Sequence, residues 1–181
     1  IDQVLTEIVQ PSLVEIGEAW HRGEISIAAE HFATQFYMQN LLGMISASIP
    51  PLHRGKIVAA CAPGEMHQIG LLMLVVMLRW RGWDVKYLGP DLSLERLEET
   101  LNTLHPRVLL FSATRPQAAA ALERLPEVFA QLTEPLPILV VGGQAFAEAR
   151  LPDSVPAVYL QGRPSEVVAA VEHIMGEIFN N

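Results

Sequence analysis

The sequence predicts an α/β protein in which an N-terminal helical segment precedes a five-stranded parallel, doubly wound sheet. Two observations lead to this prediction. Up to about residue 48 the apolar residues recur at a helical period, and after Pro50-Pro51 five short β-rich stretches alternate with helical ones. Alternating strands and helices require right-handed crossovers, which give a parallel sheet with helices on both faces. We therefore expect a helical part over residues 1–49 and a sheet domain over residues 50–181.

Two helices joined by a tight turn are expected in the first part. Arg22-Gly23 provides a basic last turn and a helix-stopping glycine, and Ser26 can cap the next helix, which together predict an antiparallel hairpin. Phe32 and Phe36 lie on a second face that a two-helix hairpin cannot cover. We therefore interpret the hairpin as part of a four-helix bundle and the chain as a fragment, with further helices upstream or on a partner. The apolar positions in helical phase are Leu5, Ile8, Leu13, Ile16, Trp20, Ile27, Met38, Leu41 and Ile45.

The second part alternates strand and helix in a regular order. Its expected strands are KIVAACA, DVKYLG, RVLLFSA, PILVVGG and AVYLQG, each bounded by Gly, Pro or Asp. Its expected helices cover residues 67–81, 93–104, 116–132, 145–150 and 164–179. In such a sheet, ligands bind beyond the carboxyl ends of the strands, where the strand order reverses.

Composition excludes several classes of function. Twelve basic and twenty acidic residues give a net charge of −8 with no basic cluster, which argues against nucleic acid as a direct partner of these residues. The longest apolar run, residues 69–78, is well short of the roughly 20 residues that span a bilayer, so no membrane is expected. Cys61 is the single cysteine, which excludes an internal disulfide and fits a reducing compartment. We expect a cytoplasmic protein.

The turns after the first four strands contain small residues that let a ligand approach the backbone. They are PGEMH, GPD, SAT and GGQ. None of them is the GxGxxG of a dinucleotide site or the GxxxxGK of a phosphate loop, so these turns contain no motif that supports nucleotide binding. Carboxylate pairs, GxSxG and HExxH are also absent, so we do not expect an enzyme.

A histidine beside a carboxylate is the most informative feature of these turns. His67 follows the first strand, and Glu65 is close enough to hold one ring nitrogen, which would make the other nitrogen a better metal ligand. Taken alone, the motif would be better explained by a histidine that caps a helix or is solvated. The hairpin brings two further motifs, Trp20-His21 and Glu30-His31, to one end of the helical segment. Singly these residues would fit a core tryptophan and exposed polar groups, whereas their coincidence with His67 favours a shared site. His53, His105 and His173 are interpreted as surface or loop residues.

The stretch GEMHQIG resembles the E/D-x-H-x-x-G signature of cobalamin-binding Rossmann-like domains of the flavodoxin-like type. Ser112-Ala113-Thr114 resembles the S-x-L that follows it, with Thr114 in place of leucine, and Gly142-Gly143 resembles the paired glycines. The resemblance implies that His67 is the lower cobalt ligand. It also implies that the cofactor is bound by the other residues of these motifs, namely Glu65, Gly70, Ser112, Thr114, Gly142 and Gly143.

The helical segment resembles the bundle of CarH-type light-sensing transcriptional regulators, because Trp20 is followed after nine residues by Glu30-His31 in a W-x9-EH pattern. This implies adenosylcobalamin as the cofactor, with Trp20, Glu30 and His31 around its adenosyl group. His21 would become the upper cobalt ligand after light removes that group. The family also implies a homo-oligomer in the dark that holds DNA through an N-terminal domain missing here. Met66 replaces a basic residue expected at the subunit contact.

Two other functions compete with a light sensor. A corrinoid carrier of a methyltransferase would use the same His67 slot, but Trp20 followed by His21 would obstruct the incoming methyl donor. A degenerate interaction module that binds no cofactor is disfavoured, because the motif residues Glu65, His67, Gly70, Ser112 and Gly143 are intact.

Overall fold

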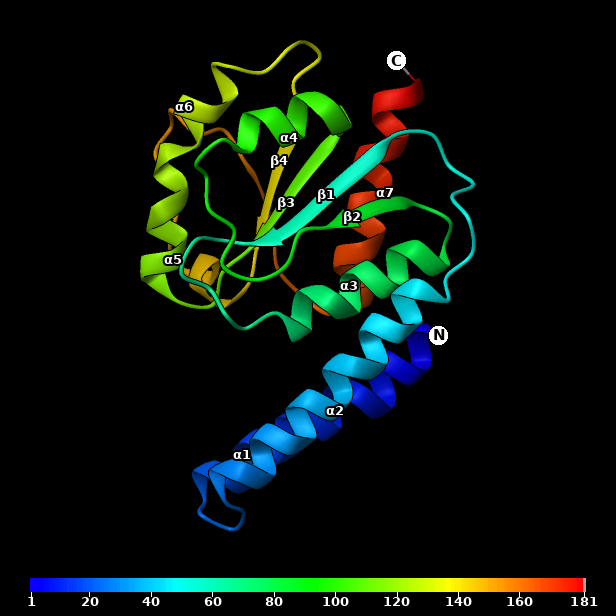
Figure 1. Ribbon diagram of the computed structural model, residues 1–181, viewed down its shortest axis with the longest axis vertical. Helices are drawn as coiled ribbons and strands as arrows, with labels where there is room; N and C mark the ends of the chain where they lie inside the picture. Colours follow the sequence, from blue (N-terminus) through cyan, green and yellow to red (C-terminus); the bar gives the residue numbers. More distant parts are fainter. Residues whose placement is uncertain (181) are drawn as a thin grey trace.

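The structure is a computed structural model that describes residues 1–180. A central sheet carries helices on both faces, and a helical hairpin projects from one side of it (Figure 1). The predicted fold class, a helical segment followed by a five-stranded parallel α/β domain, is confirmed.

All strand pairs of the sheet are parallel, in the order β2-β1-β3-β4-β5. The chain leaves β1 toward one edge and returns to form β3 on the other side of β1, so the strand order reverses between β1 and β3. Ligand crevices in open α/β sheets form at such a point. The strands are β1 (Lys56–Cys61), β2 (Asp84–Tyr87), β3 (Val108–Ser112), β4 (Ile138–Gly142) and β5 (Val158–Leu160).

Two apolar cores form because the strands are buried on both faces. In β1, Ile57, Ala59 and Cys61 pack on the side of α3 and α7, whereas Val58 and Ala60 pack on the side of α4, α5 and α6. Parallel strands covered on both faces are expected to be apolar throughout. The helices are α3 (Ile69–Trp80), α4 (Leu97–Leu104), α5 (Pro116–Ala121), α6 (Leu125–Phe129) and α7 (Pro164–Asn180).

Four helix predictions need correction at their boundaries. The helix expected over 116–132 is interrupted by a 3₁₀ turn, Leu122–Arg124, because Pro126 cannot donate to the preceding turn. The helix expected over 93–104 begins only at Leu97, after Arg96 takes a left-handed conformation with φ of 58°. The stretch expected to be helical over 145–150 is a 3₁₀ turn, Gln144–Ala147. His67 does not open α3, which begins at Ile69.

The hairpin is built as the sequence predicts. A π-helical segment, Val4–Val9, continues into α1 (Gln10–His21), and α2 (Ile27–Ser46) runs back along it. Gly23 makes the turn with φ of 73°, and Ser26 Oγ accepts a hydrogen bond from the Ala29 amide at 3.2 Å.

The open end of the hairpin is fixed to the sheet domain by packing and polar contacts. Leu5 and Leu41 are buried in the same core as α3, and Trp80 Nε1 donates to the Met44 carbonyl at 3.0 Å. Arg81 pairs with Asp2 of the hairpin and Glu172 of α7, both at 2.5 Å. The tip of the hairpin therefore extends away from the anchored end, as Figure 1 shows.

Among the helices of residues 1–180, none combines the length and the apolar character needed to cross a membrane.

Candidate functional site

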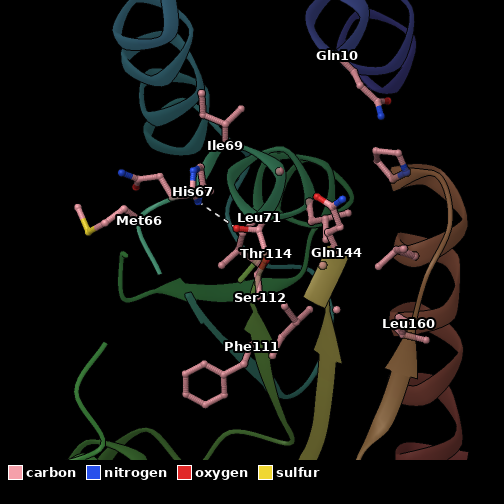
Figure 2. A pocket seen from close by; sticks show the side chains of 18 of the residues that line it. Gln10, Met66, His67, Ile69, Leu71, Phe111, Ser112, Thr114, Gln144 and Leu160 are labelled. Carbon is pink, nitrogen blue, oxygen red and sulfur yellow. Dashed lines mark hydrogen bonds between the residues drawn. The ribbon is translucent and has the colours of Figure 1, made fainter. Parts of the chain in front are cut away.

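A cavity of about 640 Å³ lies between the carboxyl ends of the strands and the hairpin. Its floor comes from the β1–α3 loop and the ends of β3 and β4, while Glu30, Thr34 and Met38 of α2 line it from the hairpin. This volume is typical of a small-molecule site. Figure 2 shows His67 and Thr114 turned toward one another above β3, with Gln10 extending toward the same space from α1.

His67 lies on the wall of this cavity with its ring largely exposed. Its Nδ1 is 2.6 Å from Oε1 of Glu65 and 3.0 Å from the hydroxyl of Thr114. Since Nδ1 donates to the carboxylate, Nε2 is the ring nitrogen that a metal ion would take. One imidazole supplies one coordination position, so a metal bound there must bring most of its other ligands with it.

Glu65 is fully buried beneath His67 and accepts five hydrogen bonds. Its Oε1 accepts hydrogen bonds from the His67 amide at 2.8 Å and from His67 Nδ1 at 2.6 Å. Its Oε2 accepts hydrogen bonds from the Thr114 amide at 2.6 Å, the Thr114 hydroxyl at 2.7 Å and the Arg115 amide at 3.1 Å. Burial by itself would raise the pKa of Glu65, but the hydrogen bonds from His67 and Thr114 outweigh it and lower the pKa to about 2. The carboxylate is therefore ionised, and it fixes the tautomer and orientation of His67.

The loop that carries Glu65 and His67 is held by its neighbours after β2 and β3. The Gly64 amide donates to Asp91 Oδ1 at 2.6 Å, and the Asp91 amide donates to the Glu65 carbonyl at 2.9 Å. The Arg115 guanidinium donates to the Gly64 carbonyl. Arg115 was missed by sequence reasoning, because its role depends on a contact across 51 positions of the chain.

Glycines form the part of the wall above β4. Gly143 has φ of 100°, and an added Cβ would lie 2.3 Å from the Ala113 carbonyl oxygen, so only glycine fits. Ser112, Gly142 and Gly143 all line the cavity, as does Gly70 at the start of α3, where an added Cβ would meet open space. These residues form a cradle without bulky side chains.

The hairpin contributes one of its four predicted site residues to the cavity. Glu30 lines it and accepts from His31 Nδ1 at 2.6 Å and from the Thr34 hydroxyl at 2.7 Å. The hydrogen bond from His31, and then that from Thr34, lowers the pKa of Glu30. On α2, Glu30, Thr34 and Met38 are four residues apart and share one stripe, whereas His31 is turned onto the next face.

Trp20 and His21 lie near the tip of the hairpin and do not join the cavity lining of the described chain. Trp20 is 40% exposed, and its ring lies 4.6 Å from that of His21, inclined by 45°. The structure therefore leaves Trp20, His21 and His31 outside the cavity and buries Glu65 beneath it. The predicted site residues that it brings together on the cavity wall are Glu30, His67, Gly70, Ser112, Thr114, Gly142 and Gly143. Their roles at a cofactor remain predictions.

The residues present fit a metal ion that is already bound in a macrocyclic chelate. They provide one oriented imidazole, a glycine-lined cradle and a roof from a separate helical element. Comparison of this chain with known protein families indicates which chelate fits. The family model described as B12 binding domain matches residues 55–171, and a second B12 binding domain model matches residues 1–45.

The chain belongs to the B12 binding domain family.

Two named relatives share much of its sequence. The chain is 29% identical over 157 residues to the HTH-type transcriptional repressor CarH of Myxococcus xanthus, covering 86% of this chain and 52% of that protein. It is 28% identical over 147 residues to the HTH-type transcriptional repressor CarA of the same organism, covering 81% and 50%. The predicted resemblance to CarH-type regulators is thereby confirmed, and the chain spans about half the length of these relatives.

Solved structures share the fold. The monomethylamine corrinoid protein of Methanosarcina barkeri matches 95% of this B12-binding chain, and 82% of its own, with a TM-score of 0.71 at 17% identity. A cobalamin-binding protein of Desulfitobacterium hafniense DCB-2 matches 96% of this chain and 82% of its own with a TM-score of 0.57 at 20% identity. At these identities the likeness concerns the fold alone.

Proposed function

We propose that the chain is the cobalamin-binding module of a transcriptional regulator, and that it senses light through adenosylcobalamin. The observation that carries this proposal is the His67–Glu65 pair on the wall of a cavity roofed by the hairpin. Membership of the B12 binding domain family and identity to two named repressors support it. The module would be a binding protein and not an enzyme, and we expect it in the cytoplasm, where a repressor reaches the genome.

Each element would have a separate task in this function. His67 would hold the cofactor from below through Nε2, with Glu65 and Thr114 keeping the ring in place. Ser112, Gly142 and Gly143 would line the slot for the cofactor's tail, and Gly70 would leave room beside it. Adenosylcobalamin would supply a weak cobalt–carbon bond that breaks after its corrin ring absorbs visible light.

The hairpin would act as the movable part. Glu30 faces the cavity, whereas Trp20 and His21 lie at the tip, so His21 can become the upper ligand only if α1 moves relative to the sheet domain. A helix displacement of this kind is a two-state change that light can bias. We propose that it changes the assembly of copies and so the DNA binding of a domain outside these residues.

A corrinoid carrier of a methyltransferase is the second candidate, and one observation favours it. Trp20 does not line the cavity, so it does not obstruct the upper side as the sequence had suggested. A carrier would keep that side open to a partner.

One experiment separates the candidates. The chain is mixed with adenosylcobalamin in the dark, then illuminated, while the visible spectrum and the size-exclusion profile are recorded. A sensor should bind in the dark, convert irreversibly to a bis-histidine spectrum and change size. A carrier should take up methylcobalamin or hydroxocobalamin and show no light-dependent change of size. Absence of uptake for every cobalamin would disprove both functions, and His67→Ala serves as the control for specific uptake.

A further inference from the structure

Neutral amide side chains surround the cavity from five different elements of the fold. They come from α1, α2, the residue before α3, the 3₁₀ turn after β4 and the turn after β5. Two of them, Gln10 and Gln144, face the same space in Figure 2. The full set is Gln10, Gln35, Gln68, Gln144 and Gln161.

The cavity wall carries little charge. Among the described residues that line the cavity, Glu30 is the carboxylate, and neither lysine nor arginine is present. The nearby Arg115 donates to the Gly64 carbonyl, so its guanidinium is engaged outside the lining. An anionic group on a ligand would therefore meet no lysine or arginine among these lining residues. A carboxylate that leaves water without gaining a partner loses free energy.

Two of the glutamines are oriented by fixed partners. Tyr87 donates its hydroxyl to Gln68 Oε1 at 2.7 Å, which leaves the Gln68 amino group as a donor for a ligand. Gln161 donates Nε2 to the Gly143 carbonyl at 3.0 Å, which leaves its oxygen as an acceptor. A carboxamide satisfies both kinds of neighbour because it donates and accepts, whereas a carboxylate only accepts.

We infer that this site discriminates by peripheral charge and selects corrinoids whose side chains are carboxamides over those that carry free carboxylates. The inference rests on the proposed binding of cobalamin. It concerns the edge of the corrin ring, separately from the ligand to the metal. The glutamines would pair with the amides of the ring, and Glu30 would repel an acid that lies under the hairpin.

The test compares ligands that differ in one group. Hydroxocobalamin and its monocarboxylate isomers, in each of which one peripheral amide is hydrolysed, are titrated into the chain at neutral pH and followed by visible spectroscopy. At least one isomer should bind about tenfold or more weakly, which corresponds to the loss of one hydrogen-bonded contact with a buried charge left unpaired. Equal affinity for hydroxocobalamin and every isomer would overturn the inference. Failure of hydroxocobalamin itself to bind would instead overturn the proposed function.

A charge substitution provides the second arm. Gln161→Lys should bring the affinity for at least one disfavoured isomer to within about threefold of hydroxocobalamin, because it adds a cation to the wall. Gln35→Lys repeats the test from the exposed surface of α2, in case the first variant does not fold. Gln117→Lys, at an exposed position of α5 outside the cavity, adds the same charge and should leave the ratio unchanged. If both wall variants fold and neither changes any ratio, the wall is not the source of selectivity and the inference fails.

Discussion

At the residue scale, the buried carboxylate of Glu65 connects two segments of the chain. It accepts from His67 in the β1–α3 loop and from Thr114 and Arg115 after β3. Thr114, which replaces the leucine of the family pattern, therefore contributes a hydroxyl to the pair that orients His67. The departure from the pattern adds a polar contact to the site.

Glu65→Gln should lower both stability and affinity. The amide would present a donor where the carboxylate accepts, leaving buried donors unpaired, so we expect a loss of about 3 kcal/mol in the free energy of unfolding. Affinity for hydroxocobalamin should fall by about 10–100-fold. Urea unfolding and spectral titration measure the two effects. Glu99→Gln, which removes an exposed ion pair with Arg96, should change stability by less than about 1 kcal/mol.

The pH dependence of stability should reflect the same carboxylate. The pKa of Glu65 is about 2 in the folded chain against an ordinary value of 4.5, so the unfolded chain binds the proton more readily. The stabilisation is therefore complete above the ordinary pKa and is lost as the pH falls toward 2. Urea midpoints between about pH 6 and about pH 3 should fall more steeply for the native sequence than for Glu65→Gln. Parallel slopes would contradict the assignment.

Two glycines of the cavity should respond in opposite ways to alanine. Gly143→Ala places a Cβ against the Ala113 carbonyl at positive φ, so we expect a loss of about 3 kcal/mol in unfolding free energy. Gly70→Ala meets open space in a helix and should leave stability unchanged or raise it by about 0.5–1 kcal/mol. Because its methyl group would enter the cavity, Gly70→Ala should still weaken cobalamin binding. Thermal unfolding and spectral titration of both variants decide this.

At the scale of elements, the hairpin has a fixed end and a projecting end. Leu41 and the contacts of Trp80 and Arg81 fix the end near α3, whereas Trp20 and His21 lie at the tip. Motion of α1 is therefore expected at the end that carries the predicted upper ligand.

His21→Ala isolates the role of that end. It should leave binding of adenosylcobalamin in the dark within about twofold, because His21 is exposed and does not line the cavity. It should remove the stable bis-histidine product after illumination, as the second imidazole is lost. An unchanged visible spectrum of the photoproduct would exclude His21 as the upper ligand, and His53→Ala is the matched control because His53 stacks on Trp83 away from the cavity.

At the scale of the whole molecule, the cavity joins two parts that are otherwise connected at the fixed end of the hairpin. A ligand that contacts both parts stabilises the folded chain through mass action, by about 2.7 kcal/mol at a hundredfold excess over Kd. We therefore expect saturating hydroxocobalamin to raise the unfolding midpoint in urea, followed by tryptophan fluorescence or circular dichroism. His67→Ala should abolish the rise, whereas an equal rise in this variant would show that binding does not use His67.

The sequence by itself determined the order of strands and helices, the hairpin turn and the motif at the end of β1. These features depend on short-range periodicity and on single residues such as Gly23, Ser26 and Pro50, whose backbone preferences act locally. The same local signals predicted one continuous helix over 116–132, which Pro126 interrupts. They also predicted that the helix after β1 begins at His67, two residues before its observed start at Ile69.

Only the tertiary structure decided which side chains share the cavity. The contact of Thr114 with Glu65 spans 49 positions, and the glutamine wall comes from five elements, so no local pattern could predict either one. Likewise, Glu30 faces the cavity and His31 does not, because the rotation of α2 is fixed by packing of Leu41 against α3. Local preferences specify elements, whereas the burial of apolar faces between them specifies the site.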